Sequence, residues 1–80
     1  MKTKQQIIDD GRSAERLLED TDLSRFLEEI ERECWGDFKM SDPDDSSGRE
    51  ATYMKLRGIE LVRQSLRAMK DNASIAMKAK

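Results

Sequence analysis

The chain has 80 residues, 40% charged and 36% hydrophobic, and its single cysteine and lack of histidine exclude an internal disulfide and histidine-based catalysis. One core of this size stabilises a fold by only about 3–5 kcal/mol, which favours efficient helix packing or self-association. The formal net charge of −2 conceals a division, because residues 1–47 carry seven Lys/Arg and fourteen Asp/Glu, whereas residues 48–80 carry eight and three.

The first predicted helix spans residues 4–18. Its apolar face is defined by residues that recur at helical spacing: Ile7, Gly11, Ala14 and Leu18. Glycine in a helix interior costs about 1 kcal/mol relative to alanine, so Gly11 needs an explanation. Either it permits close contact with another helix, or the helix begins weakly and order starts near Ser13.

The second predicted helix spans residues 22–38 and follows an acidic break, in which Asp20 or Thr21 can act as the N-cap. Its apolar periodicity is the most regular in the chain: Leu23, Phe26, Leu27, Ile30, Cys34 and Phe38. Because Cys34 lies within this stripe, we expect a buried and unreactive thiol.

Residues 40–48 contain the only proline and form the clearest loop, and a connection this short favours an antiparallel helix pair. We expect Ser46 or Ser47 to cap the third helix, with Glu50 completing a capping box. The third helix is predicted over residues 49–70. A break near Asn72-Ala73-Ser74 then leaves residues 71–80 as a frayed tail or a short helical turn.

The third helix is apolar on two faces. One face carries Ile59, Val62, Leu66 and Met69. The other carries Met54, Leu61 and Ala68, spaced by seven residues, and we interpret it as an oligomer surface because only two other helices are available to cover it.

Two aromatic residues flank the loop, outside the main apolar stripes. Trp35 and Tyr53 either anchor a partner protein or pack on each other over the open end of the helix pair. The candidate interface therefore comprises Trp35, Tyr53, Met54, Leu61 and Ala68.

Charged side chains form a second candidate surface. The third helix carries Lys55, Arg63, Arg67 and Lys70, and the second carries Glu28, Glu29 and Glu33. These groups can pair with each other within one molecule or between copies. The basic residues can instead bind an acidic partner or nucleic-acid phosphates, although a sequence pI of about 5.2 disfavours an isolated DNA-binding protein.

The sequence contains no pattern for a catalytic, metal or cofactor site. The three glutamates of the second helix are interpreted as a solvated face and not as a paired-carboxylate centre. The acidic loop resembles a calcium loop only superficially, because it lacks the ligand spacing of an EF-hand. We therefore expect a protein that is not an enzyme and needs no cofactor.

Several spaced residues resemble a family of small helical proteins encoded by tailed bacteriophages and prophages, in the gene region for head morphogenesis and DNA packaging. The resemblance is carried by Gly11-x-x-Ala14-x-x-Leu17-Leu18-x-Asp20, Phe26, Trp35, the acidic turn, Arg49-Glu50-x-x-Tyr53, Leu56, Val62 and Leu66. Family members often have Gly-x-Leu-Ala near the end, where this chain has Asn72-Ala73-Ser74-Ile75-Ala76. The family has no settled activity, so the resemblance implies a context and no catalytic residues.

Together these patterns predict one all-α domain over residues 1–80, an antiparallel helical hairpin with the N-terminal helix packed across it. We expect a non-enzymatic phage or prophage interaction protein that acts through oligomerisation or partner binding in particle assembly or DNA packaging. Alternatives are a regulator that binds a host protein through its acidic helix, and a nucleic-acid-binding packaging accessory. No membrane-spanning run or signal-peptide pattern is present, which favours a cytoplasmic location in the host cell or association with the virion.

Overall fold

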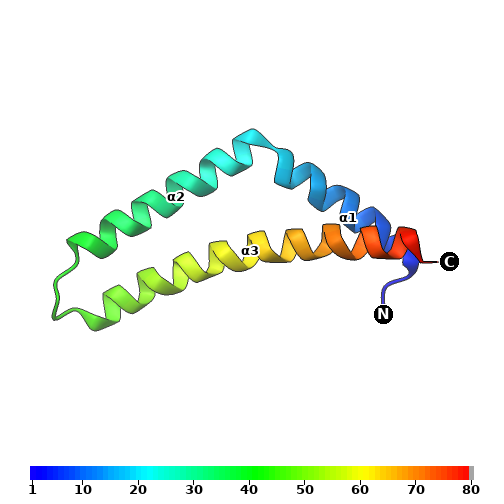
Figure 1. The fold of residues 1–80 in the computed structure, drawn as a ribbon. Coiled ribbons are helices and arrows are strands. Elements are labelled where there is room, and N and C mark those ends of the chain that lie inside the picture. Colours follow the sequence, from blue (N-terminus) through cyan, green and yellow to red (C-terminus); the bar gives the residue numbers. More distant parts are fainter. Residues whose placement is uncertain (80) are drawn as a thin grey trace.

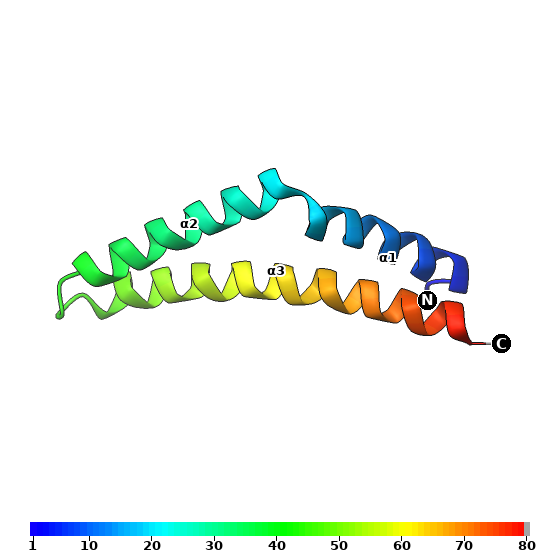
Figure 2. The same ribbon diagram turned by 45° about the horizontal axis from the view of Figure 1, so that its top comes forward.

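In the computed structural model, which describes residues 1–79, the chain folds into three helices: α1 (Lys4–Glu19), α2 (Thr21–Met40) and α3 (Ser46–Lys78). The helices α1 and α2 follow one another end to end, and both run antiparallel to the long α3 along one side of it (Figures 1 and 2). No strand occurs within residues 1–79. The predicted all-α fold of three helices is confirmed.

Side-chain caps explain where α1 and α2 begin. The Thr3 hydroxyl accepts a hydrogen bond from the Gln6 amide and the Gln6 side chain accepts one from the Thr3 amide, which completes a capping box. The Asp20 carboxylate accepts hydrogen bonds from the amides of Asp22 and Leu23. Asp20 is therefore one of the two N-caps expected for the second helix, and its extended backbone separates α1 from α2.

The start of α3 differs from the sequence-based expectation. Its N-cap is Asp45, whose carboxylate accepts a hydrogen bond from the Gly48 amide, so the predicted cap at Ser46 or Ser47 is wrong. A turn explains the earlier start, because the Asp45 amide donates to the Asp42 carbonyl oxygen at 2.9 Å. Asp45 consequently enters the helix with its carboxylate already beside the free amides of the first turn.

The tight contact between α1 and α3 holds most of the buried residues: Ile8, Gly11, Ala14 and Ala73. A Cβ atom added to Gly11 would overlap the Ala73 methyl group and lie 2.8 Å from the Met69 carbonyl oxygen. Gly11 therefore allows the two backbones to approach closely, as one of its two interpretations predicted. The other interpretation is wrong, because α1 is already helical from Lys4.

This contact changes two further expectations. The N-terminal helix does not pack across a hairpin, because α1 lies end to end with α2, at an angle to it, and covers the C-terminal half of α3 (Figure 1). The third helix also passes through Asn72-Ala73-Ser74 without a break and ends at Lys78. Burial of Ala73 against α1, at 3% exposure, stabilises helix where the local sequence suggested fraying. Lys80, at the end of the predicted tail, lies outside the described residues.

The packing between α2 and α3 is looser than that between α1 and α3. Cys34 is the buried residue of α2, as its place in the apolar stripe predicted. Phe26 and Ile30 belong to the same stripe but remain about half exposed, at 50% and 46%. The stripe is thus wider than the part of α2 that faces α3.

The molecule is long and thin, with principal extents of 57 × 26 × 15 Å. Its Cα radius of gyration is 16.9 Å, whereas a compact chain of this length has one of about 12 Å. It exposes 6361 Å² of surface, whereas a compact monomer of its mass exposes about 5,000 Å². The described chain therefore leaves unburied roughly 1,400 Å² that a compact fold would cover.

Candidate interaction surfaces

The face of α3 opposite the other helices carries a row of exposed apolar residues. Three of the predicted interface residues lie on it at seven-residue spacing, and Ile75 continues the row because α3 is longer than expected: Met54, Leu61, Ala68 and Ile75. We call these four residues the outer apolar row. All four are exposed, with Met54 at 61%, Leu61 at 53% and Ile75 at 67%.

The spacing of buried and exposed residues explains this position. On α3, the buried and half-buried residues alternate at intervals of three and four: Thr52, Leu56, Ile59, Arg63 and Leu66. This is the pattern of a helix that packs against a neighbour through one seam. Each residue of the outer apolar row lies two positions along the chain from a seam residue, which is a rotation of about 200° around the helix. The row therefore points away from α1 and α2.

An ion pair joins α2 to α3 inside the seam. The Arg63 guanidinium donates a hydrogen bond to the Glu31 carboxylate, and the two side chains are only 21% and 28% exposed. Arg63 was among the basic residues expected to pair, but Glu31 was not among the acidic ones. The sequence does contain the signal, because Glu31 lies four residues after Leu27 and three before Cys34, on the inward line of α2.

The acidic residues predicted to pair with α3 lie elsewhere. Glu28, Glu29 and Glu33 are all exposed, and none forms an ion pair within residues 1–79. They lie beside or opposite the inward line of α2, which is why α3 does not reach them. Their pairing with a second copy or with another partner stays a prediction.

The remaining basic residues of the predicted charged surface are also exposed: Lys55, Arg67 and Lys70. Arg67 lines a recess near the junction of α1 and α2, together with Leu17, Leu27 and Arg63. Of the four basic residues predicted to pair, Arg63 alone has an acidic partner within the described part of the chain.

The two aromatic residues beside the loop do not pack on each other, which was one of their two interpretations. The ring of Trp35 packs edge-on against Phe38, with centroids 6.0 Å apart, and the Arg49 guanidinium lies 4.8 Å from the centroid of the Phe38 ring. Phe38 is the central group because it ends the inward line of α2. Trp35 and Tyr53 remain about half exposed, at 50% and 54%, so both keep surface that a partner can contact.

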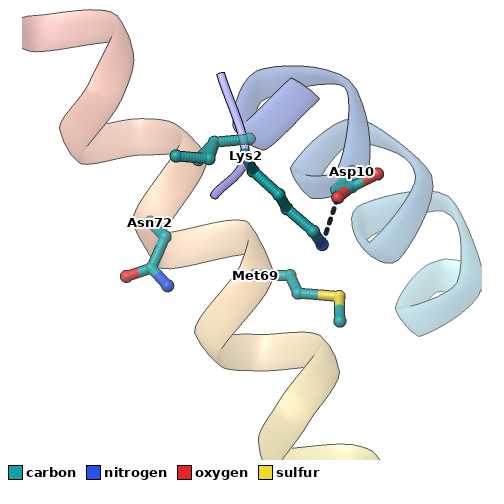
Figure 3. Close-up of a pocket in the computed structure, with 5 residues that line it drawn as sticks. Lys2, Asp10, Met69 and Asn72 are labelled. Atoms are coloured by element: carbon teal, nitrogen blue, oxygen red, sulfur yellow. Dashed lines mark hydrogen bonds and ion pairs between the residues drawn. The ribbon is translucent and has the colours of Figure 1, made fainter. Parts of the chain in front are cut away.

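The concave sites of the molecule are small. A recess of about 80 Å³ lies where the N-terminal segment meets α1 and α3, and in it Lys2 pairs with Asp10 at 2.6 Å beside Met69 and Asn72 (Figure 3). Two others measure about 210 and 110 Å³. Each is smaller than the ~300–1,000 Å³ of typical small-molecule pockets. The large exposed surfaces, not the recesses, are therefore the best candidates for function.

Two features are absent from residues 1–79, a metal-binding cluster and a membrane-spanning helix. No group of three or more cysteine, aspartate or glutamate side chains is arranged to hold a metal ion. No helix in this part of the chain has the length and apolar character needed to cross a membrane. Comparison of the chain with protein-family models, curated proteins and solved structures found no match.

Proposed function

We propose that this chain is a non-enzymatic helical interaction protein that works by self-association through the outer face of α3. The observation that carries the proposal is the outer apolar row, which leaves Met54, Leu61 and Ile75 more than half exposed on the side that no helix of the chain covers. Exposed apolar side chains that gather on one face of a protein are typical of protein-binding sites.

The exposed area supports the same proposal. The chain leaves roughly 1,400 Å² more surface exposed than a compact monomer of its mass. Stable protein interfaces bury about 1,200–2,000 Å² in total, counting both partners. Two copies together carry about 2,800 Å² of excess surface, twice the value for one chain, so an interface of this size would bury roughly half of it. Association would also add to the stability that the five buried residues provide.

The biological setting of the proposal is particle assembly or DNA packaging in a tailed bacteriophage or prophage. Its support is the resemblance of residues 11–70 to small helical proteins of that gene region. An elongated helical module that pairs with a copy of itself suits assembly, because a symmetric dimer presents each of its remaining surfaces twice to another component.

Sedimentation equilibrium across protein concentration tests the self-association. We expect the apparent mass to rise above the 9.3 kDa of one chain as concentration increases. Leu61→Glu should abolish the rise while leaving the helical circular dichroism unchanged, because Leu61 is 53% exposed and contributes little to the monomer core. Ile30→Glu, at a similarly exposed position on α2, is the matched control and should associate normally. A mass of one chain at every concentration would remove the proposal.

A further inference from the structure

The residues beside the outer apolar row carry a symmetric charge pattern. We call Glu50, Arg57, Gln64, Asp71 and Lys78 the charged row; they recur every seven residues, and all five are exposed. Arg57 and Asp71 lie seven residues on either side of Gln64, and Glu50 and Lys78 lie fourteen residues on either side. Two residues of the charged row at equal distances from Gln64 therefore carry opposite charges.

From this pattern we infer that two copies of α3 pack antiparallel through their outer faces, with a two-fold axis beside Gln64. The inference rests on the proposed self-association and specifies its geometry. A perpendicular two-fold axis makes each contact occur twice, with residue i facing residue j and j facing i. Arg57 then faces the partner's Asp71, and Glu50 faces the partner's Lys78.

The parallel alternative lacks these charge pairs. A two-fold axis along the helices would place the charged rows of the two copies on opposite sides of the contact, where Arg57 could not pair with the partner's Asp71. The complementary charges of the row would then contribute nothing to association, whereas the antiparallel arrangement forms each pair twice. The charged row therefore selects the antiparallel orientation among the ways that two copies of this helix can pair.

The geometry of the helix agrees with these pairs. If the outer faces pack so that Leu61 lies level with the partner's Ser65, Arg57 and the partner's Asp71 are offset by two residues, or about 3 Å along the axis. Side chains of an α-helix lean toward its N-terminus, and in an antiparallel pair this brings the two charged groups toward each other. None of the five residues of the charged row forms an ion pair within residues 1–79.

The steric pattern of the same face supports close packing. Small residues lie three positions before members of the outer apolar row, namely Ala51, Gly58 and Ser65. In the antiparallel register, each of these small residues meets a member of the partner's outer apolar row. The three layers are Ser65 with the partner's Leu61, Gly58 with the partner's Ala68, and Ala51 with the partner's Ile75. A small side chain thus faces an equal or larger one in each of these layers, as interdigitation requires.

Charge reversal tests the orientation in the full-length protein. Sedimentation equilibrium should show that Arg57→Glu and Asp71→Lys each raise the dimer dissociation constant on the order of tenfold, because each makes two symmetry-related contacts repulsive. The double variant Arg57→Glu/Asp71→Lys should dimerise as tightly as the unmodified chain, since it only exchanges the two charges. Arg67→Glu makes the same change of charge beside the inner recess and is the matched control.

Steric blocking gives a second measurement. A Cβ on Gly58 or on Gly36 would meet no other helix within 4 Å, so we expect leucine at either position to leave the monomer folded. Gly58→Leu should prevent dimerisation, whereas Gly36→Leu on α2 should not, and circular dichroism should show unchanged helicity for both.

The outcomes separate the two proposals. A chain that remains monomeric at every concentration removes self-association itself. A chain that dimerises, but whose dimer is insensitive to both single charge reversals and to Gly58→Leu, retains self-association and overturns the antiparallel α3 interface. Single reversals that weaken the dimer, without recovery in the double variant, also overturn the antiparallel pairing.

Discussion

Replacing Gly11 by alanine tests the close contact on which the fold depends. The added methyl group would overlap Ala73 and lie 2.8 Å from the Met69 carbonyl oxygen, whereas carbon atoms in contact are normally about 3.5–4.0 Å from their neighbours. The obstacle includes backbone atoms, so a change of side-chain rotamer cannot relieve it. The helices α1 and α3 must therefore move apart by about 1 Å or more.

Two opposing effects determine the size of the change. Alanine is a better helix former than glycine by about 1 kcal/mol, which favours the variant. Overpacking of a close contact typically costs about 1–3 kcal/mol, and separating the helices also exposes Ile8 and Ala14, which are only 9% and 1% exposed. We expect a net loss of about 1–2 kcal/mol, a large part of the ~3–5 kcal/mol available to a core of this size.

Urea unfolding followed by helical circular dichroism, at one fixed protein concentration, measures this change. Gly36→Ala is the matched control, because a Cβ on Gly36 meets no atom within 4 Å, and it should gain about 0.5–1 kcal/mol. The same substitution should thus act with opposite sign at the two positions. An equal gain in stability at Gly11 and Gly36 would refute the close-contact reasoning.

A double-mutant cycle separates the overlap from other effects. Ala73→Gly removes the methyl group that the new side chain meets but leaves the Met69 carbonyl oxygen in place. The variant Gly11→Ala/Ala73→Gly should therefore be more stable than the sum of the two single changes predicts, without full recovery. Simple additivity would show that the two residues do not share a contact.

Two further predictions concern polar groups. Glu31→Gln should lower the free energy of unfolding by about 1–3 kcal/mol, because it weakens a charge-assisted hydrogen bond to the half-buried Arg63. The control Glu28→Gln, at an exposed position, should change it little. Equal effects of the two substitutions in urea unfolding would contradict the pairing of Glu31 with Arg63. Asp45→Ala should lower the free energy of unfolding by about 1 kcal/mol because the α3 cap is lost, whereas Ser47→Ala should change it little. A larger loss of stability for Ser47→Ala would show that Ser47 is the cap, as the sequence predicted.

The outer apolar row of α3 could be predicted only in part from the sequence. The seven-residue spacing of Met54, Leu61 and Ala68 is visible without a structure, and it predicts a second apolar face. Ile75 joins that face only because α3 continues to Lys78. The same extension brings Asp71 and Lys78 into the helix, so the symmetry of the charged row could not be recognised with a helix that ended at residue 70.

The sequence by itself determined the local features of this protein. Helical periodicity predicts three helices, the acidic segment around Asp20 and Thr21 marks the break between the first two, and the apolar stripe places Cys34 in the interior. These features depend on residues within one or two helical turns of each other, so their spacing along the chain is sufficient.

Only the tertiary structure decided which residues meet across the molecule. The backbone contact of Gly11 with α3 holds the Ala73 segment helical, although its local sequence suggests a break. The position of α3 beside α2 selects Glu31, and not its three exposed neighbours, as the partner of Arg63. The physical reason is that burial depends on what lies opposite a helix face, and periodicity within one helix carries no information about its neighbour.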